Sequence, residues 1–270
     1  MIEIGTSNTG LIVSRDITGF LSRKREMSGK NRTSMSPNTF NRNTLMIELA
    51  MAAGNRAISG PDGKPVIYIN TPFIPPKWKD TTDKLRAIYY QLAIELLAET
   101  TSASTPYRLT FNLTPDFTRK VMKEGGLTIV HDRLSKRLKR IGCEADFWLA
   151  IEAVIKNGGK SGGWNHFKGR PHIHGSILLT PEQKEIVSGA IRTINGPANV
   201  IFKRNETRLL PLEDEKGGGK RHAEYCLKHV GWNNVFMPHT NNLSRTTRIG
   251  RVAKELYEQD RTSIKMFSAT

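Results

Sequence analysis

FWLAIEAVI at residues 147–155 and PHIHGSILL at residues 171–179 are the two stretches of sequence that decide the fold. Both are short, apolar and bounded by polar or turn-forming residues, which is typical of buried strands. The segment between them, NGGKSGGWNHFKG at 157–169, is rich in glycine and can reverse the direction of the chain. We therefore predict that the second stretch returns antiparallel to the first.

Further elements are predicted on both sides of these strands. YRLTFNLT at residues 107–114 alternates like a strand, and Pro115 opens a helix whose continuation carries a dense basic face. The sequence after the second strand predicts a helix at 181–193, a strand at 198–203, a flexible hinge at 213–221 and a helix at 222–229.

Residues 1–103 are expected to form a largely helical N-terminal extension. Residues 1–44 are rich in Ser, Thr, Asn, Arg and Lys and have little hydrophobic periodicity, so an arm is expected there. Helices are predicted at 44–57 and at 83–99, the second capped by Thr82 or Asp83, with a short strand at 66–70 between them. Residues 236–270 are expected to form a C-terminal tail or helix.

The charge of the chain favours a polyanionic partner. The 270 residues carry a net charge of +16, and residues 101–270 hold 28 Lys or Arg against 16 Asp or Glu, whereas residues 1–100 hold 13 against 9. Such an excess is typical of proteins that bind nucleic acid, although ribosomes or anionic membranes would attract it as well. Charge therefore indicates a class of partner and not a reaction.

The cysteines and the apolar runs limit the cellular setting. Only Cys143 and Cys226 occur, far apart and without zinc-finger spacing, so neither a disulfide framework nor a zinc ribbon is expected. The N-terminus lacks the pattern of a signal peptide, and no apolar run approaches the roughly 18 residues that a membrane span needs. We expect a cytoplasmic protein that does not enter a membrane.

A first set of chemically active residues lies on the two deciding strands. His172 and His174 flank Ile173, and because side chains alternate along a strand, both imidazoles should share one face while Ile173 points into the core. Seven histidines in 270 residues would produce this spacing by chance roughly 0.2 times, so its context must carry the argument. That context is Glu152, a carboxylate inside an apolar strand, where burial is costly unless it is paired or bound to metal.

These three side chains are candidate ligands of Mg²⁺ or Mn²⁺. If the glycine-rich segment closes a hairpin, Glu152 can lie beside His172 and His174, and phosphate and water would complete the shell. His166 competes with Glu152 as the third ligand. Glu152 could instead pair with an arginine such as Arg108 from a neighbouring strand.

A second set of candidate residues is Tyr225 and Lys228. Residues three apart lie on one face of a helix, so the ammonium group can approach the phenol. A tyrosine becomes a covalent nucleophile once its phenolate is stabilised, and a lysine one turn away offers that stabilisation. An exposed helical tyrosine without a chemical role is the alternative.

Together, in this order along the chain, these elements resemble the HUH endonuclease superfamily, specifically its rolling-circle replication initiators. The family's metal motif of two histidines around a hydrophobic residue is matched by His172, Ile173 and His174. Its nucleophile motif, a helical tyrosine with a lysine three residues later, is matched by Tyr225 and Lys228. LTFNLT at 109–114 loosely matches its first motif, and Glu152 matches the acidic third ligand, although the loop after it is longer than in the shortest family hairpins. The resemblance covers about residues 104–234.

The resemblance implies an α+β fold in which a central antiparallel sheet carries the His-hydrophobic-His motif and helices flank it, within a nicking domain at residues 104–235. It also implies site-specific nicking of single-stranded DNA at an origin or hairpin, through a 5′-phosphotyrosine on Tyr225 and with a free 3′-hydroxyl. No second tyrosine lies close to Tyr225, so we expect a single-tyrosine enzyme. The chain lacks a phosphate-binding P-loop, so a bacterial host helicase and polymerase are the expected partners during replication of a phage or plasmid.

The segment between the two strands and the biological process remain open. Trp164, Phe167, Lys168 and Arg170 could guide single-stranded DNA by stacking and charge, or they could form only a flexible basic loop. A mobilisation relaxase or a single-tyrosine transposase would use the same chemistry in another process. A metal-dependent hydrolase without a covalent intermediate, and a non-enzymatic basic DNA-binding protein, are the alternatives of other classes.

Overall fold

The computed structural model is an α+β structure made of two units. It describes residues 4–7, 10–13, 56–59, 65–69, 75–101, 103–152, 171–194, 207–212, 218–228, 230 and 241–268. One unit comprises Met1–Asp80 together with Tyr257–Thr270, and the other comprises Thr81–Leu256. No helix in the described part of the chain has the length and apolar character needed to cross a membrane.

The described part of the first unit comprises a small antiparallel sheet with strand order β1-β2-β4-β3, a short 3-10 turn, η1, and the end of helix α9 (Thr247–Ser268) from Tyr257 onward. The residues expected to form a C-terminal tail or helix thus include a helix. The strand predicted at 66–70 is confirmed as β4. The predicted helix at 44–57 is wrong at its end, because Arg56 and Ala57 pair with β4 instead; residues 44–55 lie outside the described residues. The elements are β1 Ile4–Ser7, β2 Gly10–Val13, β3 Arg56–Ser59, β4 Pro65–Ile69 and η1 Trp78–Asp80.

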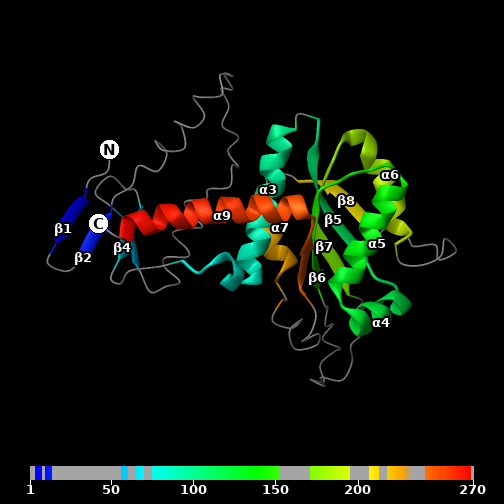
Figure 1. Ribbon diagram of the computed structural model, residues 1–270, viewed down its shortest axis with the longest axis horizontal. Helices are drawn as coiled ribbons and strands as arrows, with labels where there is room; N and C mark the ends of the chain where they lie inside the picture. Colours follow the sequence, from blue (N-terminus) through cyan, green and yellow to red (C-terminus); the bar gives the residue numbers. More distant parts are fainter. Residues whose placement is uncertain are drawn as a thin grey trace. The chain divides into compact units, whose positions relative to one another are not determined.

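The second unit is organised around a five-stranded antiparallel sheet with the order β8-β5-β7-β6-β9 (Figure 1). The two deciding stretches pair as predicted, with Phe147 opposite Ile177 and Glu152 opposite His172. The predicted strand at 198–203 lies outside the described residues, and two edge strands were not predicted. The strands are β5 Thr105–Asn112, β6 Phe147–Glu152, β7 His172–Leu179, β8 Thr207–Pro211 and β9 Leu243–Arg245.

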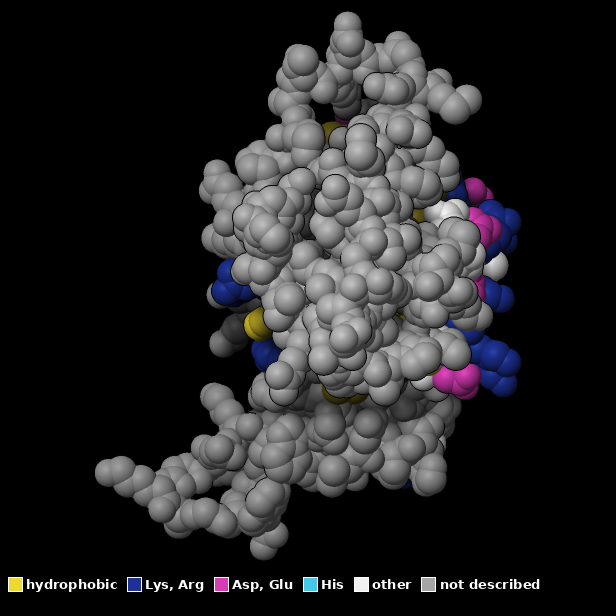
Figure 2. Space-filling view, turned by 90° about the vertical axis from the view of Figure 1, so that its left-hand side faces the viewer, with side chains coloured by type: hydrophobic (Ala, Val, Ile, Leu, Met, Phe, Trp, Pro, Cys, Tyr) yellow, Lys and Arg dark blue, Asp and Glu magenta, His cyan; other side chains and the backbone are white. Residues whose placement is uncertain are grey.

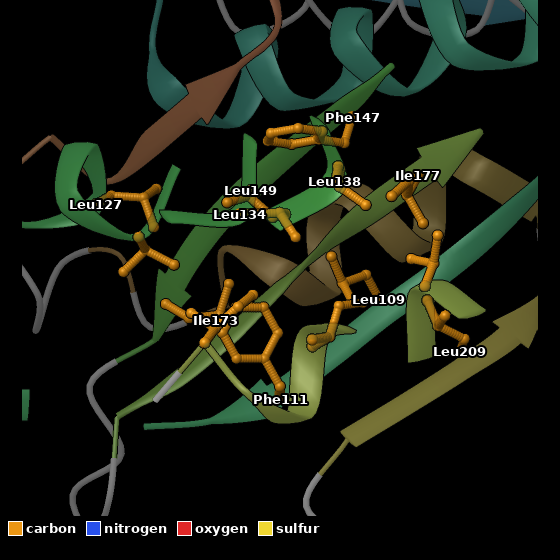
Figure 3. Packing of buried hydrophobic residues seen from close by; sticks show 14 of the residues in the cluster. Leu109, Phe111, Leu127, Leu134, Leu138, Phe147, Leu149, Ile173, Ile177 and Leu209 are labelled. Atoms are coloured by element: carbon orange, nitrogen blue, oxygen red, sulfur yellow. The ribbon is translucent and has the colours of Figure 1, made fainter. Parts of the chain in front are cut away.

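One face of this sheet forms the hydrophobic core with α4 (Pro115–Glu124), α5 (Leu127–Arg140) and α6 (Pro181–Arg192). Every second residue of the central strands points into this layer, where each fully buried large apolar side chain contributes about 1.5–3 kcal/mol. Figure 3 shows Leu109, Phe111, Leu149, Ile173 and Ile177 from the strands packed with Leu134 and Leu138 of α5.

The helix predicted after Pro115 is two helices and not one. Its first segment, α4, ends at Gly125, whose φ of 117° lies in the left-handed region that favours glycine. Gly126 then precedes the first residue of α5. The helix predicted at 181–193 is confirmed as α6, and a capping box formed by Thr180 and Gln183 fixes its start.

The opposite face of the sheet is covered by α3 (Asp83–Thr100) and α7 (Gly218–Cys226), as Figure 1 shows. Thr82 caps α3 as predicted, since its hydroxyl accepts from the Leu85 amide at 3.3 Å. The side-chain Oε1 of Gln91 in α3 accepts from the Trp148 indole N–H at 3.1 Å and from the Ser176 hydroxyl at 2.6 Å, so α3 is bound to β6 and β7 by polar contacts.

The predicted hinge at 213–221 is wrong in its second half, because Gly218–Arg221 form the first turn of α7; residues 213–217 lie outside the described residues. Gly219 allows α7 to pack closely on α3, since a Cβ there would lie 1.6 Å from the Glu95 carboxylate and 2.6 Å from Gln91. The helix start is therefore determined by packing and not by the glycine content that suggested a hinge.

Replacing Gly175 with alanine is expected to lower the free energy of unfolding by about 3 kcal/mol or more. A Cβ at this position of β7 would lie 2.0 Å from the Trp148 carbonyl oxygen, so the β6–β7 pairing would have to shift. Gly189→Ala on α6 is the matched control, because nothing lies within 4 Å of its Cβ position and a helical Gly→Ala change stabilises by about 0.5–1 kcal/mol. Urea denaturation measures both; equal stabilities for the two variants would contradict the close approach.

Candidate active site

The candidate site lies on the face of the sheet opposite the core and combines residues from four elements. Alternation along the strands places Thr110 of β5, His172 and His174 of β7, and Glu152 of β6 on this face. In the sheet register, Thr110 is directly opposite His174, and Glu152 is directly opposite His172. As predicted, Ile173 points the other way and is completely buried in the core.

Glu152 is the buried charge at the centre of this arrangement, with 3% of its surface exposed. Its Oε2 lies 2.7 Å from Nε2 of His174, and its Oε1 lies 3.3 Å from the ammonium nitrogen of Lys228. A buried carboxylate needs such partners, because leaving it uncompensated costs several kcal/mol. The structure thus joins the two sets of residues that the sequence analysis selected separately.

Both ring nitrogens of His174 have partners. Nδ1 is 3.1 Å from the Thr110 hydroxyl oxygen, while Nε2 faces Glu152. If Nε2–H donates to the carboxylate, Nδ1 accepts from the hydroxyl, so the two contacts select one tautomer. Thr110 was not identified from the sequence; its place on the polar side of the alternating strand at 107–114 is the signal that could have indicated it.

His172 lies beside His174 with its ring parallel. The ring centroids are 6.1 Å apart and the planes differ by 8°. This agrees with the prediction that the two imidazoles share one strand face. The pair forms a continuous imidazole surface next to Glu152.

Tyr225 and Lys228 come to this face from α7 and the turn after it. The Tyr225 ring meets His174 edge-on, with 5.5 Å between the centroids, and 52% of the tyrosine is exposed. The Lys228 ammonium nitrogen lies 3.7 Å from the centre of the same ring. The phenol is therefore accessible from outside while its ring is held between a histidine and a lysine.

The helix predicted at 222–229 begins earlier and ends at Cys226. The next two residues form a turn in which the Leu227 amide donates to the Glu224 carbonyl and the Lys228 amide donates to the Tyr225 carbonyl. These three-residue hydrogen bonds tighten the end of the helix. Lys228 consequently stays on the same side as Tyr225, although it is outside the helix.

Lys228 is a stable cation in this setting. Burial alone would lower its pKa, but the hydrogen bond to Tyr225 and the negative charge of Glu152 outweigh burial, and the pKa is raised. The residue therefore supplies positive charge near the phenol. A lysine of this kind stabilises an anion and does not act as a general base near neutral pH.

His222 is a functional neighbour that the sequence analysis did not single out. Its Nε2 donates to the Gly175 carbonyl at 2.8 Å, which ties α7 to β7 three residues before Tyr225. Its position one helical turn before the Tyr225–Cys226 pair was the available signal. Cys226 lies 3.6 Å from the same nitrogen and is buried, and burial raises the pKa of its thiol far above the usual range. Cys226 is thus an inert packing residue and not a competing nucleophile.

The buried His222 is expected to make stability depend on pH. Burial lowers its pKa from 6.5 to about 4, so above pH 6.5 the ring is neutral in both the folded and the unfolded chain. As the pH falls from 6.5 to 4, only the unfolded chain gains the proton, and the free energy of unfolding should fall by up to about 3 kcal/mol.

Urea denaturation of the wild type and of His222→Gln between pH 7 and pH 4 measures this effect. Glutamine retains a donor for the Gly175 carbonyl but does not titrate, so the variant should lose this part of the pH dependence. The carboxylates of the chain are the same in both proteins and contribute equally to the pH dependence of stability. Identical slopes for the two would show that His222 is not buried as a neutral ring.

The imidazole and carboxylate side chains on this face are of the types that bind divalent metal ions. Two ligand atoms at right angles on an ion with bonds of about 2.1 Å are about 3.0 Å apart, and the 2.7 Å between His174 Nε2 and Glu152 Oε2 is close to that spacing. His172 supplies a second imidazole opposite Glu152. As they stand, no three His, Cys, Asp or Glu side chains in the described ranges form a group arranged around an ion.

Other predicted site residues are not part of the described structure. Trp164, His166, Phe167, Lys168 and Arg170 all lie in the segment 153–170, outside the described residues.

The predicted basic face of α5 lies on the core side of the sheet, away from Tyr225. One of its members has a structural role, since Arg133 donates to the Ile194 carbonyl at 3.0 Å and lies over the Phe117 ring. On the face drawn in Figure 2, described Lys and Arg side chains appear at both edges, and acidic side chains lie among them at one edge.

Comparisons of the chain with family models, with curated proteins and with solved structures give no match.

Proposed function

We propose that this chain is a metal-dependent endonuclease that nicks single-stranded DNA and becomes covalently attached to the cut end through Tyr225. One observation carries the proposal. A half-exposed phenol, a lysine that is stably charged, and a histidine-carboxylate pair meet on one sheet face, although Glu152 and Tyr225 are far apart in the sequence. This combination supplies a nucleophile, a counter-charge and metal-ligand chemistry, as the resemblance to HUH endonucleases implies.

In the proposed reaction, the Tyr225 oxygen attacks the scissile phosphorus and forms an O–P bond. The bond to the 3′-oxygen of the preceding nucleotide breaks, and the proton lost by the phenol is balanced by the proton gained on that oxygen. The products are a 5′-phosphotyrosine and a free 3′-hydroxyl, and one phosphodiester replaces another, so the step can be reversed to rejoin the strand.

The side chains around Tyr225 have distinct roles in this reaction. Lys228 stabilises the developing phenolate and the phosphate charge from its position over the ring. Thr110 and Glu152 hold the His174 ring in one orientation. With an ion on Nε2, the ring proton would be on Nδ1 and would donate to the Thr110 hydroxyl. An ion held by His172, His174 and Glu152 would act as a Lewis acid on the phosphate oxygens.

The proposed biological setting follows from the same chemistry. The free 3′-hydroxyl can prime a polymerase, so we place the reaction at the origin or hairpin of a phage or plasmid that replicates by a rolling circle in a bacterial host. Host helicase and polymerase would then act on the nicked strand. Mg²⁺ and Mn²⁺ are the proposed ions because their oxygen preference is met by phosphate and water.

End-labelled single-stranded oligonucleotides test the proposed function. Oligonucleotides that form hairpins, together with a random single-stranded pool, are incubated with the protein and Mn²⁺ and separated on denaturing gels. A 3′-labelled strand should yield labelled protein, whereas a 5′-labelled strand should yield a shorter free fragment. Duplex DNA and samples with EDTA are the controls. Retention of DNA without any adduct would identify a binding protein, and transfer of the 5′ label would reverse the proposed polarity.

A further inference from the structure

The position of Lys228 has a consequence for metal binding. Its ammonium nitrogen is 3.3 Å from Oε1 of Glu152, and this lysine is part-exposed whereas the carboxylate is buried. His174 occupies the other carboxylate oxygen at 2.7 Å. A cation therefore already neutralises the carboxylate that is proposed to hold the divalent ion.

From the same position, Lys228 also contacts Tyr225. Its nitrogen lies 3.7 Å from the centre of the Tyr225 ring, and a lysine ammonium on a flexible stem can interact with either an aromatic face or a carboxylate. Tyr225 is half-exposed, so the ammonium can approach the phenolic edge without entering the sheet. Glu152 and Tyr225 thus share the charge of one lysine.

We propose that Lys228 is an internal counter-cation, which neutralises Glu152 until a divalent ion binds and then interacts with Tyr225 alone. The inference rests on the proposed metal site. A buried carboxylate is destabilised when it loses a counter-charge, and two cations next to the same carboxylate oxygen repel each other. Lys228 must therefore leave Oε1 when an ion is bound there.

This exchange couples the nucleophile to the metal. Without an ion, Lys228 divides its interaction between Glu152 and the Tyr225 ring. With an ion bound, its whole charge is available to the phenol and to the incoming phosphate. Tyr225 therefore becomes a strong nucleophile only when the site also holds the ion.

Titration of the protein with MnCl₂ alone, without DNA, tests the exchange. Removal of the competing charge by Lys228→Met should tighten Mn²⁺ binding about tenfold or more, as measured by calorimetry and by the paramagnetic resonance signal of free Mn²⁺. Lys228→Arg keeps the charge and should bind Mn²⁺ about as weakly as the wild type. An affinity of Lys228→Met that equals or falls below that of the wild type would overturn the proposal.

Lys84→Met is the matched control for the loss of one positive charge. Lys84 also pairs with a glutamate across α3 and α7, at 3.2 Å from Glu224, and its side chain is largely exposed. Its removal should change the Mn²⁺ affinity by less than about twofold. Equal tightening by both lysine variants would show a general effect of net charge and would overturn the exchange.

A double substitution tests whether the effect passes through Glu152. In a Glu152→Gln background, Lys228→Met should no longer tighten Mn²⁺ binding, because the lysine then has no carboxylate to neutralise. Continued tightening would overturn the proposed route. Circular dichroism checks the fold of each variant, and Lys228→Gln replaces Lys228→Met if the apolar side chain prevents folding.

The adduct assay separates failure of this inference from failure of the proposed function. Mn²⁺ binding that is tighter in Lys228→Met, together with the absence of an adduct between the wild-type protein and any DNA, would support the exchange and remove the nicking function. A Tyr225-dependent adduct with unchanged Mn²⁺ affinity would support nicking and remove the exchange. Absence of Mn²⁺ binding by both the wild type and Lys228→Met would remove the exchange together with the metal assignment.

Discussion

Tyr225→Phe is expected to abolish both the cleavage of single-stranded DNA and the covalent attachment of the protein, with nicking reduced by a factor on the order of 10⁴ or more. The substitution removes one oxygen, which is the proposed nucleophile. The phenylalanine ring retains the edge contact with His174 and the position beneath Lys228. Because the residue is 52% exposed, the free energy of unfolding should change by less than about 1 kcal/mol.

Denaturing gels with end-labelled DNA and peptide mapping of the trapped adduct measure this effect. Tyr107→Phe is the matched control, since it removes the same oxygen from a tyrosine on β5 and should leave nicking intact. A nucleotide found on Tyr107 or Tyr257 would assign the nucleophile elsewhere. Normal nicking by Tyr225→Phe would also end the proposed mechanism.

His174→Ala is expected to eliminate nicking while DNA affinity changes by less than about threefold. The His174 ring contacts both Thr110 and Glu152 and is a proposed metal ligand. Its loss therefore removes a partner that orients the Glu152 carboxylate and also removes a ligand of the ion. Affinity rests mainly on Lys and Arg contacts with phosphates, which this substitution leaves in place. His172→Ala should have the same effect on cleavage through the loss of the neighbouring imidazole.

Fluorescence anisotropy at fixed salt measures the affinity, and the denaturing gel measures cleavage. His131→Ala is the matched control, because His131 belongs to α5 and packs against Phe147 on the core side of the sheet. Its removal should leave the reaction intact. Full cleavage by a variant that lacks both His172 and His174 would remove the metal assignment.

The pairing of the two deciding strands could be predicted from local patterns alone. Their apolar composition indicated burial, and the glycine-rich segment between them indicated a reversal. The two-residue period of a strand then placed His172 and His174 on one face and Ile173 on the other, as the structure has them. The cost of burying a carboxylate indicated that Glu152 must have a partner.

The boundaries of several elements could not be predicted, because packing between distant segments determines them. The glycines before His222 suggested a hinge, but close contact with α3 makes them part of α7. The apparent single helix after Pro115 breaks at Gly125, whose backbone is left-handed. For residues other than proline, the local helix propensity differs by about 1 kcal/mol per residue at most, which tertiary contacts readily exceed.

The sequence by itself determined the chemical candidates: His172, His174, Glu152, Tyr225 and Lys228 were all selected by residue type and spacing. Only the tertiary structure decided how they combine. Glu152 is paired with both His174 and Lys228, and Thr110 and His222 orient the histidine and the helix. Periodicity describes which way a side chain points on its own helix or strand. The contact between Glu152 of β6 and Lys228 after α7 depends instead on how distant elements pack, and residue spacing along the chain does not specify that packing.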